Sequence, residues 1–250
     1  MKISIITPVY NDPRIELCIQ SISHQQGNFE IEHIVVDSNS TDKTVDILQS
    51  YKEHIDVLIR EDDNGLYDAI NKGINRATGD VIGILNADDK YQDNFVLDAV
   101  ANTMSNTTVD ICYGDLVYVN DQDNIVRYWQ SGAYKPYKYY LGWMPPHPTF
   151  FVRSELYENI GLYDTTIPIA ADYDLMLRFL LKNDVSVQYI DQVLVRMTIG
   201  GMSNSSIRNM IQAIKDMYKT WDKYNQFGKY IVPLLHPLEK SPQYLRKPPK

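Results

Sequence analysis

Apolar residues in the first hundred positions follow two alternating patterns. Short continuous runs such as Ile3–Ile6 and Val81–Leu85 are typical of strands buried on both faces. Between such runs, apolar residues recur every three or four positions, the spacing of an amphipathic helix. This alternation predicts βαβ units and a mostly parallel sheet. We expect strands at Ile3–Ile6, Ile31–Asp37, Ile55–Ile59 and Val81–Leu85, and helices around Arg14–Gln25, Val45–Tyr51, Tyr67–Ala77 and Phe95–Met104.

Beyond residue 110 the pattern becomes α+β in character. Two strand-like segments, Asp110–Tyr118 and Ile125–Trp129, flank a polar turn and predict a hairpin. No internal repeat and no Gly/Ser-rich linker interrupts the chain, so we expect one domain over residues 1–204 and a C-terminal appendage over residues 205–250. Further strands are expected at Thr149–Val152 and Val185–Ile190, and helices near Ser154–Ile160, Asp172–Lys182 and Ile207–Tyr224.

The composition is that of a soluble globular protein, with 44% hydrophobic and 22% charged residues in a chain of 250. No apolar run reaches the 18 or so residues needed to span a bilayer, and the N-terminal apolar stretch is too short for a signal peptide. The two cysteines, Cys18 and Cys112, fall in different predicted elements and indicate buried thiols in a reducing compartment. We therefore expect a cytoplasmic protein.

Charge is unevenly distributed along the chain. The last 22 residues carry a net charge of +4, while the preceding 228 carry −12. The acidic body argues against nucleic acid as a partner, because nucleic-acid recognition needs a basic surface. The tail from Phe227 combines apolar and basic residues, which fits a peripheral membrane contact or packing against a neighbouring subunit in a homo-oligomer.

Polar loops follow three of the predicted strands. Thr7-Pro8, Asp37 and Asp88 should all lie at the carboxyl ends of parallel strands, where open α/β sheets bind their ligands. Asn86-Ala87-Asp88-Asp89 offers oxygen ligands for a divalent cation that also holds phosphates, or an ordinary helix-capping turn. The Asp37 carboxylate can accept hydrogen bonds from a ribose or a base, and the loop after it also fits a helix cap.

The two common phosphate-binding loops are absent. The first turn, residues 7–11, lacks the glycines of a dinucleotide fold, and there is no Gly-x-x-x-x-Gly-Lys-Ser/Thr sequence. Bound phosphates would therefore depend on a metal ion and isolated cations. The missing Gly-rich loop also argues against a sugar nucleotidyltransferase.

Other candidate residues each have a functional and a purely structural interpretation. Asp68, Asp172 and Asp174 stand at predicted helix starts, where acids favour the helix dipole. His147 lies in a proline-rich loop, and Trp143 ends an aromatic stretch suited to sugar rings, lipid or core packing. Residues 198–204 fit a mobile lid or a capping linker.

Taken together, five segments resemble family 2 glycosyltransferases, bacterial enzymes of polysaccharide and lipopolysaccharide synthesis with the GT-A fold. The resemblance spans roughly residues 1–200 and implies an α/β three-layer sandwich of the Rossmann type. Residues 1–114 would form the nucleotide-sugar-binding half and residues 115–204 the acceptor-side half. The matching segments are residues 5–11, 34–42, 63–73, 85–89 and 169–175.

The resemblance also implies roles for individual residues. Asp88 would hold Mn²⁺ or Mg²⁺ on the donor diphosphate, and Asp172 would be the general base of an inverting transfer. Two positions depart from the family pattern, with Asn86 in place of an aspartate and Ala171 in place of a glutamate. Donor contacts would come from Thr7, Pro8, Tyr10, Asn11, Asp37, Ser38, Asp68, Lys72, Asn86, Ala87 and Asp88, and acceptor or sugar contacts from Asp89, His147, Asp174 and Trp143.

We thus expect an enzyme that moves a hexosyl or N-acetylhexosaminyl group from a nucleotide diphosphate donor, a UDP-sugar, to a hydroxyl of a glycan. A lipid-linked acceptor at the inner face of the plasma membrane fits the aromatic stretch and the tail. Because two positions depart from the family pattern, an alternative interpretation is a catalytically degenerate protein that binds nucleotide-sugar without turnover.

Overall fold

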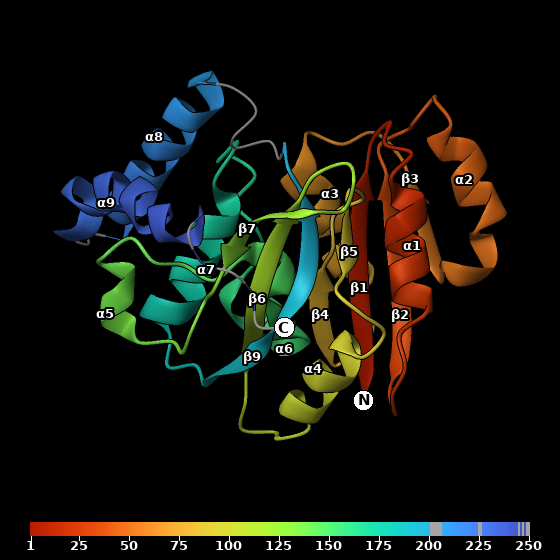
Figure 1. Cartoon of the computed structure of the whole chain (residues 1–250), viewed down its shortest axis with the longest axis horizontal. Helices are drawn as coiled ribbons and strands as arrows, with labels where there is room; N and C mark the ends of the chain where they lie inside the picture. The colour runs from red at the N-terminus through yellow and green to blue at the C-terminus, as the bar shows by residue number, and fades with distance from the viewer. Residues whose placement is uncertain (201–206, 225–226, 245, 247, 249–250) are drawn as a thin grey trace.

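The computed structural model describes residues 1–200, 207–224, 227–244, 246 and 248. A twisted central sheet runs through the molecule, with helices on both faces (Figure 1). Neighbouring residues of β1 show how the layers form, because successive side chains of a strand point to opposite faces. Ile6 packs beneath Gly73 of α3, while the Thr7 hydroxyl lies 3.7 Å from the Cys18 thiol of α1. The α/β three-layer fold predicted from the sequence is confirmed.

The first half consists of parallel strands joined by helices. β1 lies between β2 and β4 and pairs in parallel with both, and β2 pairs in parallel with β3. Their carboxyl ends therefore meet at one edge of the sheet. The elements are β1 (Lys2–Val9), α1 (Ile15–Ser23), β2 (Glu30–Asp37), α2 (Thr44–Ser50), β3 (Val57–Arg60), α3 (Leu66–Arg76), β4 (Val81–Ile84), β5 (Asp89–Tyr91) and α4 (Val96–Met104).

The second half adds mainly antiparallel pairs to the same sheet. The strand order is β3-β2-β1-β4-β8-β6-β9-β5, and β7 pairs with β6 as the predicted hairpin. β4 and β6 pair antiparallel with β8, whereas β6 and β9 are parallel. The elements are β6 (Ile111–Val119), β7 (Ile125–Trp129), α5 (Pro136–Tyr139), β8 (Phe151–Arg153), α6 (Ser154–Ile160), α7 (Ala171–Lys182), β9 (Val187–Thr198), α8 (Ile207–Lys223) and α9 (Val232–Glu239).

Two features of the sheet differ from the sequence prediction. β9 continues to Thr198, eight residues beyond the predicted end at Ile190, because it pairs with both β6 and β5. Asp89 opens the short strand β5, although we expected it in a turn, and it lies opposite Met197 of β9. The Thr198 hydroxyl donates to the Asp88 carbonyl, so β9 supports the acidic loop from behind.

The C-terminal helices pack against the body of the same chain. Trp221 of α8 donates a hydrogen bond to the buried Tyr173 hydroxyl on α7, and His236 of α9 donates from Nδ1 to the Gly142 carbonyl at 2.6 Å. The Arg127 guanidinium donates to Gln243. In the described part of the chain, no helix combines the length and the apolar character needed to cross a lipid bilayer. Cys18 and Cys112 are buried free thiols, as predicted.

The close contact between α3 and β1 predicts a cost for any side chain at Gly73. A Cβ there would lie 2.4 Å from Cγ2 of Ile6, so Gly73→Ala should lower the free energy of unfolding by about 1–3 kcal/mol, as overpacking does. Urea unfolding measures this. The exposed neighbour Asn75→Ala is the control, and it should be neutral or slightly stabilising because alanine favours helix. Equal stability of Gly73→Ala and wild type would contradict the packing.

Burial lowers the pKa of His236 to about 3. The folded protein therefore keeps this ring neutral, while the unfolded chain binds a proton below about pH 6.5, so stability is lost as the pH falls from 6.5 toward 3. Between pH 5.5 and 4, His236→Gln should reduce the slope of unfolding free energy against pH by about 1.4 kcal/mol per pH unit. Asn75→Ala, which removes no titratable group, should leave the slope unchanged. An unaltered slope in His236→Gln would show that α9 does not bury this ring.

Candidate active site

Two adjoining cavities lie at the carboxyl ends of β1 and β4. Their volumes are about 510 Å³ and 490 Å³, within the roughly 300–1,000 Å³ range of ligand sites. Because they share walls, they form one cleft, which we call the main cleft. The walls common to both cavities are Pro8, Val9, Tyr10 and Leu66.

The first two loops of the main cleft are locked to each other through Asn11. Its side-chain carbonyl accepts hydrogen bonds from the backbone amides of Thr41 and Asp42. Its backbone amide donates to the Ser40 hydroxyl at 2.8 Å. Asn11 has a φ of 47°, a conformation that asparagine tolerates better than most residues. Of the predicted donor residues of the first loop, Pro8 and Tyr10 line the cleft, whereas Thr7 is fully buried beside His33.

Asp37 is fully buried beneath the smaller cavity. One oxygen accepts the Ser40 amide at 2.9 Å, and the other lies 3.0 Å from Nε of Arg60. Its neighbour Ser38 lines the cavity and donates to Asp63. The contacts of Asp37 thus order the loop that follows it. Ser38, Asp62 and Asp63 lie at the surface of the cleft.

Asp68 and Lys72 lie behind the cavity walls. The Asp68 carboxylate accepts the Asn64 amide at 2.9 Å, and the Lys72 ammonium lies 3.0 Å from Glu61 and donates to the Asp62 carbonyl. Both side chains hold the loop at residues 61–65, which forms part of the smaller cavity. Neither lines the cleft in the conformation seen here.

The acidic loop after β4 reaches the larger cavity. Asn86, Ala87 and Asp88 line it. The pKa of Asp88 is raised by burial, and Nη2 of Arg14 lies 3.6 Å from its carboxylate. Asp89 is buried behind it, where burial and the Asp88 charge raise its pKa well above the usual value. The loop therefore places two carboxyls side by side in surroundings that disfavour their ionised forms, with Arg14 as the charged partner of Asp88.

The side-chain oxygens of this loop are of the kind that bind divalent cations. The Asn86 side-chain oxygen is buried and has no hydrogen-bond partner, while its amide nitrogen donates to Asp89 at 3.1 Å. Among the described residues, no group of three or more His, Cys, Asp or Glu side chains is arranged to hold a metal. Mg²⁺ sites commonly use one or two protein oxygens and complete the shell with water and substrate phosphates, so Asp88 and Asn86 fit such a site.

Asp172, at the start of α7, lines the same cavity. Its Oδ1 accepts the Tyr173 amide at 2.8 Å and lies 3.2 Å from the Tyr67 hydroxyl, which donates to the Ile169 carbonyl at 2.6 Å. Tyr67 stands on α3, so this contact joins the two halves of the fold. The carboxylate is held at the cavity surface by groups that do not neutralise it.

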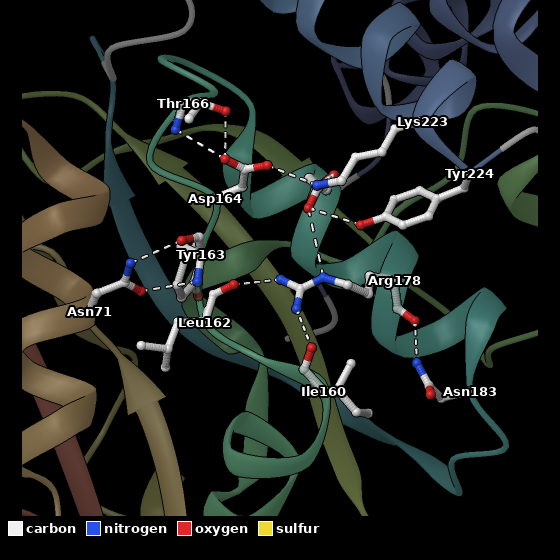
Figure 2. Close-up of polar contacts among 11 residues, drawn as sticks. Asn71, Ile160, Leu162, Tyr163, Asp164, Thr166, Arg178, Asn183, Lys223 and Tyr224 are labelled. Carbon is white, nitrogen blue, oxygen red and sulfur yellow. Dashed lines mark hydrogen bonds and ion pairs between the residues drawn. The ribbon is translucent and has the colours of Figure 1, made fainter.

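Polar contacts fix the loop that leads into α7, as Figure 2 shows. Asn71 of α3 donates to the Tyr163 carbonyl at 2.9 Å and accepts its amide at 3.0 Å. The Arg178 guanidinium donates to the carbonyls of Ile160 and Leu162, and Lys223 pairs with Asp164 at 2.8 Å. The position of Asp172 therefore depends on α3, α7 and α8 together.

His147 also lines the larger cavity. Its Nε2 lies 2.6 Å from the Tyr163 hydroxyl, and burial lowers the pKa of the ring, which favours the neutral form at pH 7. Tyr163 stacks on Tyr67 with ring centroids 5.6 Å apart. His147 therefore lies in the wall of the larger cavity, and its role as an acceptor or sugar contact stays a prediction.

The cleft does not include Asp174 or Trp143. Asp174 is fully buried on another face of α7, where it lies 3.6 Å from the Lys223 ammonium. Trp143 is 5% exposed and donates to the Ser131 carbonyl at 2.8 Å, in a cluster with Tyr113 and Tyr139. Trp143 is thus packed in the core, one of the interpretations of its aromatic stretch, and Asp174 is a buried acid in the first turn of α7. Of the predicted lid, residues 201–204 lie outside the described part of the chain.

The main cleft also contains residues that we did not predict. Lys240, directly after α9, lines the larger cavity, and burial lowers its pKa to about 8. In the sequence it is one cation of a basic tail, so no local pattern distinguished it. Tyr67 appeared only as the start of a predicted helix. Tyr118, Trp129 and Met197 complete this wall from the second half of the sheet.

Comparison with known proteins identifies what this chain is similar to. Residues 4–167 match the family model described as glycosyl transferase family 2. A "PGL/p-HBAD biosynthesis glycosyltransferase" of Mycobacterium tuberculosis is 29% identical over 211 residues, which cover 82% of this chain and 80% of the relative. The match with this relative covers a larger share of the chain than the family segment does.

Solved structures share the fold at low sequence identity. Staphylococcus aureus TarS superposes with a TM-score of 0.65 and 17% identity over 89% of this chain, which spans 39% of that TarS chain. A shorter TarS chain in complex with UDP-GlcNAc gives a TM-score of 0.64 at 14% identity over 98% of this chain and 93% of that one. Pyrobaculum calidifontis mannosyltransferase PcManGT, in complex with GDP-Man and Mn²⁺, gives 0.63 at 20% identity, covering 94% of this chain and 68% of that one.

Proposed function

Because the chain belongs to glycosyl transferase family 2, we propose that it transfers a hexosyl or N-acetylhexosaminyl group from a UDP-sugar to a hydroxyl of a lipid-linked glycan. The observation that carries the proposal is the larger cavity, which both Asp88 and Asp172 line. Inverting transfer needs such a pair of sites, one for the leaving diphosphate and one for the acceptor proton. A bound nucleotide-sugar in the TarS and PcManGT complexes supports this class of donor.

In the proposed donor complex, the nucleoside occupies the smaller cavity. Ser38, Asp62 and Asp63 offer polar groups there, and Pro8 and Tyr10 form the wall that continues into the larger cavity. Asp37 acts by ordering the loop that carries Ser38. The diphosphate would then reach Asp88, and the sugar would extend toward Asp172.

Asp88 and Asn86 would hold Mn²⁺ or Mg²⁺ in this complex. When bound, the cation offsets the negative charge that develops on the leaving diphosphate. Arg14 pairs with Asp88 and offsets part of its charge. Lys240 adds a positive charge to the wall of the same cavity.

The chemical step that we propose is a direct displacement. The acceptor hydroxyl gives its proton to the Asp172 carboxylate as its oxygen bonds to the anomeric carbon. The bond from that carbon to the diphosphate oxygen breaks on the opposite face, so the anomeric centre is inverted and the diphosphate leaves with the electron pair. The Tyr67 hydroxyl and the Tyr173 amide keep the carboxylate aimed at the cavity.

Asp172→Asn should lower the transfer rate by about 10²–10⁴-fold and leave UDP-sugar affinity nearly unchanged, because the general base contacts the acceptor and not the donor. Coupled detection of UDP release measures the rate, and calorimetry measures donor binding. Asp174→Asn is the matched comparison. It removes a buried partner of Lys223, so it should lower stability while the folded fraction keeps its rate.

Retained activity in Asp172→Asn would contradict the base assignment. Wild-type protein that binds a UDP-sugar but shows neither transfer nor donor hydrolysis would instead favour a nucleotide-sugar-binding protein without turnover. The presence of Asn86 and Ala171 motivates that second candidate, because each occupies a position where the family pattern has an acid.

Asp88→Asn should weaken the binding of UDP in the presence of Mn²⁺ by tenfold or more and have little effect on UDP binding in EDTA, since it removes the charged oxygen ligand. Thermal shift with UDP, with and without MnCl₂, reports this, because a ligand of the native state raises its apparent stability. The exposed Asp46→Asn makes the same change of charge away from the cleft and should behave as wild type. Equal Mn²⁺ dependence in both variants would remove Asp88 from the metal site.

A further inference from the structure

A third cavity of about 380 Å³ opens from the main cleft and runs between α7, α8 and α9. We call it the side groove. It shares four wall residues with the larger cavity, so a molecule can occupy both at once. The shared walls are Met144, Ile169, Asp172 and Lys240.

Most of the residues that line the side groove are apolar. Met210, Ala213, Ile214 and Met217 line one wall, at the spacing that places residues on a single face of α8. Pro233 of α9 lies on the opposite wall. Such a surface favours an occupant that buries hydrocarbon.

Two polar side chains on these walls, His236 and Arg127, form hydrogen bonds within the protein itself. Nδ1 of His236 donates to the Gly142 carbonyl, and burial favours the neutral ring. The Arg127 guanidinium donates to Gln243. A sugar ring inside the groove would lose hydrogen bonds to water and find few replacements among the described residues, which costs free energy for each hydroxyl.

The groove is also open to an occupant from outside. The side chains of Met210 and Ile214 are 51% and 39% exposed, although they stand on the apolar face of α8. At the inner end the surroundings become polar, where the Asp172 carboxylate and the Lys240 ammonium face the cavity. The occupant must therefore combine an apolar body with a polar end, which a glycolipid does and a free sugar does not.

We propose that the side groove binds an alkyl chain of the acceptor, joined directly to the sugar that carries the reacting hydroxyl. This inference rests on the proposed function for the identity of the polar end. Because Asp172 stands where the groove meets the main cleft, a hydroxyl at this carboxylate and a chain in the groove belong to neighbouring parts of one molecule. The acceptor is accordingly a short glycolipid, and the end of a long polysaccharide does not fit.

Binding of n-alkyl glucosides to the full chain in the presence of UDP and Mn²⁺ tests the groove without requiring turnover. Calorimetry below the critical micelle concentrations should show Kd falling about fourfold for each added methylene from butyl to octyl, as expected for full burial of each group. Methyl glucoside should bind weakly or not at all.

Two substitutions on α8 test whether the alkyl chain binds in the side groove. Ile214→Asp puts a charge into the groove, and Ala213→Phe fills it without a charge, so both should abolish the dependence on chain length. Ile211→Asp is the control, because Ile211 is 50% exposed on the same helix and does not line the groove. Circular dichroism verifies that each variant is folded, and either groove variant alone suffices for the test.

The outcomes separate this inference from the proposed function. Donor hydrolysis or transfer with no dependence on alkyl length overturns the groove assignment and leaves the glycosyltransferase intact. Chain-length dependence that survives in both groove variants overturns the assignment as well. If the isolated protein forms dimers that Ile214→Asp dissociates and Ile211→Asp does not, a second copy covers the groove and the inference fails. Chain-length-dependent binding without any donor turnover supports the groove and counts against the proposed function alone.

Discussion

Hydrogen bonds between α3 and the loop that precedes α7 fix the two halves of the main cleft relative to each other. Asn71 binds both the amide and the carbonyl of Tyr163, and Tyr67 reaches Ile169 and Asp172 from the same helix. These contacts join residues about one hundred positions apart in the chain. Buried polar groups of this kind are costly to leave unpaired, so the loop has one favourable position. The position of this loop in turn determines where Asp172 lies.

The chemistry of the cleft arises from charge placed where water is scarce. Parallel pairing brings the ends of β1, β2 and β4 to one edge, where Asp88 is partly buried and Asp89 is fully buried. Burial raises the pKa of both carboxyls, because ionised carboxylates are costly in such surroundings. A ligand that brings positive charge relieves this cost, which is a physical reason for donor and cation to bind together.

Much of the fold could be predicted because its strands carry strong local signals. The continuous apolar runs of β1 and β4 admit few other interpretations, and α6 begins and ends at the predicted residues. Prediction was weaker where distant partners determine structure. β9 extends through the polar residues Asp191 and Gln192 because two strands flank it, and α9 forms although Pro233 and Pro237 interrupt its pattern. Within the site, the helix-start pattern alone could not separate Asp172 from Asp174, and it was the resemblance that singled out Asp172 as the general base. Both residues open α7, and the packing of α8 shows that Asp174 is the buried one. The same packing brings Lys240 to the cleft.

The arrangement of α7, α8 and α9 has an evolutionary consequence. The family match ends at residue 167, before the candidate base and before both helices that line the side groove. Substitutions on the exposed face of α8 can alter the groove without touching the strands that form the nucleotide-side loops. Two chains with the same family signature could in this way diverge in the molecules they modify while their donor halves stay alike. Paralogues of one ancestral gene would then differ first in their last eighty residues.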